Sequence, residues 1–92
     1  MSDINLAIAW YRATQWSLLK SVVADPDVIE DTYLEWLEVA EARVAELEEL
    51  GLEANKVDVD VEEMVAWCKT RDMPLDGRAR AQFVGVKYQG SI

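Results

Sequence analysis

The first two dozen residues are apolar on nearly every side when they are drawn as a helix. Between residues 3 and 24, apolar side chains recur at helical spacing along one broad face. The opposite face is also apolar, because Ala9, Ala13 and Trp16 lie on it among a few polar side chains. A helix that is apolar most of the way round is either central in its own domain or packed against another chain. The pattern predicts a helix over residues 3–24 with two apolar sides.

A second periodic segment follows over residues 26–50, between a start signal and a stop signal. Asp25 and Pro26 mark the start, since proline costs no hydrogen bond in the first turn of a helix. Gly51 marks the end, because glycine readily adopts the left-handed conformation that closes many helices. Apolar side chains line one face of this segment and carboxylates line the other. Two long amphipathic helices joined by a tight turn predict an antiparallel helical hairpin.

The last third of the chain carries signals for two shorter helices. Asp60 followed three residues later by Glu63 is typical of a capping box, which predicts a helix over residues 61–71. Asp76 is a candidate cap for a further helix over residues 77–86. These helices would pack across the hairpin and complete its core.

Two short stretches with alternating polarity interrupt the helical pattern. Residues 56–59 and 84–88 fit either a short strand or the end of a helix. A minor β-ribbon formed by these two stretches is therefore an alternative. Helical periodicity dominates the rest of the chain. We therefore predict an all-α fold, a small helical bundle in which residues 1–92 form one domain.

Charge is concentrated in the middle of the chain. Residues 25–63 hold fifteen of the eighteen carboxylates but only two basic side chains, Arg43 and Lys56. Seven of these carboxylates lie on the outer face of the segment 26–50, whereas Arg43 projects to its apolar side. The net charge of −9 disfavours binding to nucleic acid, because the phosphate backbone is also negative.

Composition also limits which catalytic and metal-binding roles the chain can have and which cellular compartment it fits. The chain has no histidine, which removes the commonest general base and the commonest transition-metal ligand. Cys68 is the single cysteine, so no intramolecular disulfide can form, and we interpret it as a small buried side chain. The N-terminal apolar stretch is interrupted by polar residues and resembles neither a signal peptide nor a membrane span. We expect a cytoplasmic protein without a membrane association and without a metal or cofactor.

Two other classes of function remain as alternatives. Glu35, Glu38 and Glu41 have the Glu-x-x-Glu spacing that some helical, Mg²⁺-dependent nucleotide pyrophosphohydrolases use. These glutamates lie opposite the apolar stripe, on the outer face of the helix. This position disfavours such an enzyme, since the metal-binding glutamates of these pyrophosphohydrolases point into a cleft between helices. The segments 61–71 and 77–86, which carry Lys69, Arg71, Arg78 and Arg80, have the outline of a helix-turn-helix DNA-binding protein. We predict no catalytic residue.

Protein–protein contact has positive support. The chain holds four tryptophans, and tryptophan and arginine dominate the energetics of protein interfaces. We therefore predict a non-enzymatic interaction module that forms a homodimer through the helix 3–24 and docks on a basic protein partner. The interface candidates are Ala9, Arg12, Ala13, Trp16, Lys20 and Trp67. The candidates for an acidic docking face are Glu30, Glu35, Glu38 and Glu41.

Overall fold

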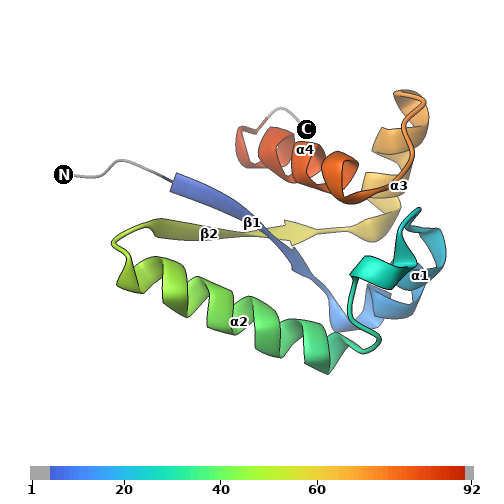
Figure 1. The fold of residues 1–92 in the computed structure, drawn as a ribbon. Coiled ribbons are helices and arrows are strands. Elements are labelled where there is room, and N and C mark those ends of the chain that lie inside the picture. The colour runs from blue at the N-terminus through green and yellow to red at the C-terminus, as the bar shows by residue number, and fades with distance from the viewer. Residues whose placement is uncertain (1–4, 91–92) are drawn as a thin grey trace.

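The computed structural model describes residues 5–90 and combines helices with a small sheet, so the all-α prediction is wrong (Figure 1). Along the chain the elements are β1 (Asn5–Tyr11), the short 3-10 helix η1 (Ala13–Gln15), α1 (Trp16–Val22), the 3-10 helix η2 (Pro26–Val28), α2 (Tyr33–Glu49), β2 (Glu53–Val59), α3 (Val61–Thr70) and α4 (Gly77–Tyr88). The two strands pair in parallel, with Ala9 opposite Val57 and Tyr11 opposite Val59. The fold is therefore a mixed α/β arrangement rather than a helical hairpin.

The predicted helix over residues 3–24 is the largest error. Residues 3 and 4 lie outside the described residues, and the rest of the segment divides into β1, η1 and α1. The physical reason is that helices cover both faces of β1, so both faces of the strand are apolar. A strand of this kind has the same continuous apolar pattern as a buried helix, and periodicity alone does not separate the two.

The sheet lies between two helical layers (Figure 1). On one face, Ala7 and Ala9 pack against the core beneath α4, and their small side chains let that helix approach the strands closely. On the other face, Trp10 meets Trp36 of α2 with ring centroids 5.2 Å apart. Each strand is thus held between a helix on either side.

The second predicted helix forms over a shorter range than residues 26–50. A 3-10 turn at Pro26 is followed by an extended break, and α2 begins only after Thr32. Thr32 and Glu35 form a full capping box, in which the Glu35 N–H donates to Thr32 Oγ1 at 3.1 Å. The helix ends as the sequence indicates, with Gly51 at φ +80° and the Leu52 N–H donating to the Leu47 carbonyl at 3.1 Å. Among the residues described before α2, no long antiparallel partner helix is present, because α1 spans only Trp16–Val22.

The C-terminal part follows the sequence more closely. The helices α3 and α4 occupy nearly the predicted ranges 61–71 and 77–86, with Asp60 and Asp76 as their N-caps. Glu63 does not close a capping box, because its carboxylate pairs with Lys87 of α4.

The predicted β-ribbon is also wrong. Residues 56–59 belong to β2, which pairs with β1, whereas residues 84–88 are helical and end α4. Pairing β2 with β1 rather than with the C-terminus places the strands at the centre of the molecule.

The core gathers side chains from both strands and from α1, α3 and α4. Its fully buried large members are Leu19, Val59, Val61, Met64 and Phe83. A second cluster, of aromatic rings, joins the end of β1 to the starts of α1 and α2. Its members are Trp10, Tyr11, Trp16, Tyr33 and Trp36. Within residues 5–90, no helix has the length and apolar character needed to cross a membrane.

Candidate functional site

The outer face of α2 is an exposed acidic surface. Glu38 and Glu41 lie on it one turn apart, and both are exposed to solvent. Glu35 is also exposed, but its carboxylate accepts hydrogen bonds from Thr32 and serves the helix cap. Glu30 precedes the helix and is half-buried. Of the four predicted docking residues, Glu38 and Glu41 are therefore the two that α2 presents freely to a partner.

This acidic surface has no basic counterpart in the protein's own ion pairs. Between residues 5 and 90 the ion pairs are Arg12–Asp58, Lys20–Asp31, Arg80–Asp25 and Lys87–Glu63. None of them involves a residue of α2, although this helix holds six glutamates and a single arginine. The basic side chains of these pairs neutralise carboxylates in loops and in other elements, so the negative charge of α2 is not compensated by them. Leu34, which is 74% exposed, adds an apolar side chain one turn before Glu38.

The two tryptophans predicted at the interface are buried within the protomer. Trp16 is 5% exposed and lies in the aromatic cluster, where its indole N–H donates to the Asp31 carbonyl at 3.4 Å. Trp67 is 9% exposed and meets Phe83 edge to face. The guanidinium of Arg71 covers the Trp67 ring at 4.3 Å. Neither ring is available for contact with a partner in this conformation.

The other four candidates do not share one surface. Ala9 is half-buried in β1, and Ala13 is exposed in η1. Arg12 makes a two-point ion pair with Asp58, whose shorter distance is 2.6 Å. Lys20 donates to two backbone carbonyls and to the Asp31 carboxylate. The helix face that would have united these residues does not exist, because a strand and a turn replace it.

Several carboxylates outside α2 have lowered pKa values. Arg12 lowers the pKa of Asp58 through their hydrogen-bonded ion pair. The Gln15 side chain donates to Asp60 and lowers the pKa of that carboxylate, which also caps α3. Burial raises the pKa of the Cys68 thiol, and the protonated form is a poor nucleophile. The causes of these shifts are ion pairs, hydrogen bonds and burial within the fold.

The geometry gives the two alternative functions little support. Glu35, Glu38 and Glu41 do not converge, and no group of three potential metal ligands is found in the described part of the chain. Of the basic side chains on α3 and α4, Arg80 and Lys87 are occupied in ion pairs with Asp25 and Glu63. Fewer cations therefore remain for phosphate than the sequence suggests.

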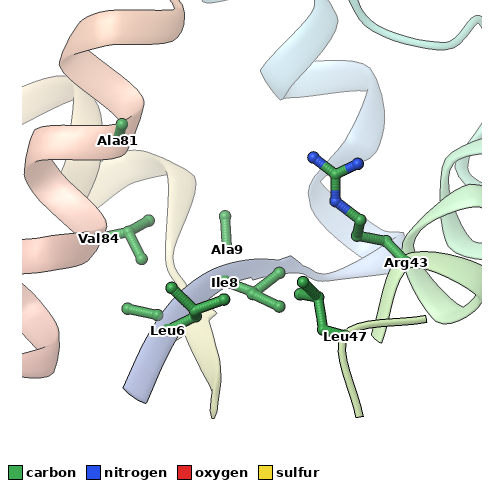
Figure 2. Close-up of a pocket in the computed structure, with 8 residues that line it drawn as sticks. Leu6, Ile8, Ala9, Arg43, Leu47, Ala81 and Val84 are labelled. Carbon is green, nitrogen blue, oxygen red and sulfur yellow. The ribbon is translucent and has the colours of Figure 1, made fainter. Parts of the chain in front are cut away.

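A groove that the sequence analysis missed runs along the free edge of β1 (Figure 2). It has a volume of about 420 Å³. Its floor is Leu6, Ala7, Ile8 and Ala9; one wall is Ala81 and Val84 of α4, and the other is Arg43 and Leu47 of α2. Arg43 already stood out in the sequence as the one basic residue turned to the apolar side of its helix. Its role at a groove does not follow from a predicted helix over residues 3–24, because the groove requires Asn5–Tyr11 to form a strand.

Comparisons with known proteins add no assignment. No family model matches the chain, and no curated protein or solved structure is significantly similar to it. The functional argument therefore rests on the geometry and charge of the described residues.

Proposed function

We propose that this chain is a non-enzymatic interaction module that binds a basic protein through the outer face of α2. The observation that carries the proposal is the uncompensated charge of that helix, since its exposed glutamates take part in none of the ion pairs of residues 5–90. A row of unpaired carboxylates on a rigid helix attracts a positively charged surface over a distance of about a Debye length.

The position of the acidic face supports the same function. Glu38 and Glu41 project from a helix that is packed on the sheet through its opposite side, so binding there requires no rearrangement of the core. Leu34 would supply apolar contact next to the charged surface. An interface of this kind combines electrostatic steering with a small apolar anchor.

Charge reversal on α2 tests the proposal. Tagged wild-type chain and the variant Glu38→Lys/Glu41→Lys are used to capture partners from the native cell, with cross-linking to locate the contact. We expect the variant to capture the basic partner at least about tenfold less well, because like charges then face each other. Capture by the wild type should weaken as salt is raised.

The matched control is Glu53→Lys/Glu62→Lys, which changes the net charge equally at exposed positions outside α2. This control should retain capture, and circular dichroism should show that both variants are folded. Undiminished capture by the α2 variant, or capture that does not respond to salt, would refute the proposal.

A further inference from the structure

The two edges of the sheet differ in how they are protected. In a two-stranded sheet each strand has one edge whose backbone groups are unpaired, and such edges readily bind another strand. Proteins usually protect them with charged side chains. β2 carries Glu53, Lys56 and Asp58, all exposed, whereas the described side chains of β1, from Leu6 to Tyr11, include no charge. The edge of β2 is protected in this way and the edge of β1 is not.

The groove described above opens onto this unprotected edge. Successive residues of a strand point to opposite faces of the sheet. A groove that touches four consecutive residues, Leu6 to Ala9, must therefore face the edge of the strand rather than one face. Its walls on α2 and α4 stand apart on either side of β1 and leave the edge accessible (Figure 2).

The flank of α2 beside this groove carries a stripe with an internal symmetry. Val39, Arg43, Glu46 and Leu50 are separated by four, three and four residues, so they lie on one side of the helix and its C-terminal cap. Arg43 lines the groove, which places the stripe on the groove side. Val39 is 57% exposed and Leu50 is 69% exposed. The side chains of the stripe follow the order apolar, basic, acidic, apolar. When two copies of the helix lie antiparallel, each basic side chain therefore faces an acidic one and each apolar side chain faces an apolar one.

We propose that a second copy of this chain covers the edge of β1. In this dimer the two β1 strands pair antiparallel across a twofold axis and make one four-stranded sheet. The axis also places the two α2 helices antiparallel on one face of the sheet. Val39 then meets the partner's Leu50, and Arg43 meets the partner's Glu46, each contact occurring twice as an isologous interface requires.

One axis satisfies both contacts. The stripe has its centre between residues 44 and 45. Arg43 and Leu47, on either side of this centre, line the same groove as Ile8 in the middle of β1. The charge pattern selects a second copy over an unrelated extended peptide. A peptide would pair with the strand but would not bring an acidic group to Arg43 and a basic group to Glu46, and no ion pair of Arg43 is found within residues 5–90.

Charge exchange on the stripe tests the dimer. Molar mass is measured by light scattering and sedimentation over a range of protein concentrations. The wild type should have twice the monomer mass. Arg43→Glu and Glu46→Arg should each raise the dissociation constant of the dimer at least about tenfold, because each change places like charges together twice. The double variant Arg43→Glu/Glu46→Arg should restore dimerisation, since it only exchanges the partners.

The control variant is Glu41→Arg, which makes the same charge change as Glu46→Arg but on the outer face of α2, and it should remain dimeric. All these positions are exposed, so circular dichroism should show intact folding. A monomeric wild type at every concentration would overturn the proposal. So would a dimer that tolerates both single changes, or single changes whose effects the double variant does not reverse. The mass readout is independent of partner capture, so failure of this dimer leaves the docking proposal intact, and the reverse also holds.

Discussion

At the scale of single residues, burial of Trp16 depends on the backbone that precedes it. In a continuous helix this residue would share a face with Arg12 and Lys20. Because the chain instead leaves β1 through η1, the indole turns into the aromatic cluster and packs against Tyr11, Tyr33 and Trp36. A tryptophan count signals buried area or an interface, but the local backbone decides between the two.

Asp25 is a residue whose contribution to stability should depend on pH. Its carboxylate accepts hydrogen bonds from Arg80 at 2.6 Å and from the Gly77 N–H at 3.1 Å, and Arg80 lowers its pKa. A folded-state pKa below the ordinary 3.8 means that the stabilisation is complete above that pH and is lost as the pH falls through the folded value. Asp25→Asn should lower the free energy of unfolding by about 1–2 kcal/mol at pH 7 and by progressively less in acid.

Urea denaturation at several pH values measures this difference, with Asp27→Asn as the control. Asp27 is exposed in η2, so its substitution should change the unfolding free energy by less than about 0.5 kcal/mol. If Asp25→Asn cost the same at pH 7 and in acid, the ion pair with Arg80 would not be the source of the stabilisation.

At the scale of elements, three local end signals are confirmed, whereas the start signal at Asp25 and Pro26 and the pairing of distant segments are not. The N-caps Asp60 and Asp76 and the C-terminal Gly51 act within a few residues, so the limits they mark could be predicted from the sequence. The strand β1 is defined by pairing with β2, whose residues follow 48 positions later, as Asn5 opposite Glu53 shows. No local signal in the sequence shows that these two segments pair. In addition, a strand that is covered on both faces lacks the alternation of polar and apolar residues that identifies a half-exposed strand.

The same limit applies to the candidate surfaces. The exposure of Glu38 and Glu41 could be predicted because it follows from helical periodicity alone. The groove could not, since it needs β1, α2 and α4 in their tertiary places.

Two glycines separate the effect of backbone conformation from that of packing. Gly51 has φ +80° at the end of α2, whereas Gly85 lies within α4, and an added Cβ would meet no atom within 4 Å at either site. Gly51→Ala should lower the free energy of unfolding by about 1 kcal/mol, because alanine is strained in the left-handed conformation. Gly85→Ala should raise it by about 0.5–1 kcal/mol, because alanine favours helix.

Urea denaturation of both variants at one protein concentration gives these values. The two substitutions add the same methyl group. Changes of opposite sign in the free energy of unfolding would therefore come from the backbone conformation at each site and not from packing of the methyl group. Destabilisation of equal size at both sites would show that φ at Gly51 does not control the end of α2.

At the scale of the whole molecule, charge is divided between two roles. The basic residues Arg12, Lys20, Arg80 and Lys87 join elements that are distant in the sequence. The glutamates of α2 form no ion pair in residues 5–90, although Glu35 caps the helix with Thr32, and several of them repel one another along the helix. Four of the nine basic residues thus serve internal ion pairs, while α2 presents its excess negative charge on one surface, which supports the proposed binding of a basic partner.

This division predicts opposite responses of stability and docking to salt. Glu35–Glu38, Glu38–Glu41 and Glu46–Glu49 are like-charge neighbours three residues apart on α2, and each pair costs about 0.2–0.5 kcal/mol at low salt. Raising ionic strength from about 10 mM to about 150 mM shortens the Debye length from about 30 Å to about 8 Å. Because neighbours three residues apart are closer than this final Debye length, only part of their repulsion is screened. The midpoint of thermal unfolding should then rise by about 1–4 °C, whereas capture of the basic partner should weaken.

Glu38→Gln removes two of the three repulsive pairs and should flatten the response of stability to salt, while Glu53→Gln on β2 should leave it unchanged. Dimer formation can also raise the unfolding temperature, but that contribution grows with protein concentration, whereas relief of repulsion within α2 does not. Calorimetry at two protein concentrations separates the two effects. A midpoint that falls with salt would mean that the surface ion pairs outweigh the repulsion within α2, and the charge of that helix would then no longer count as uncompensated.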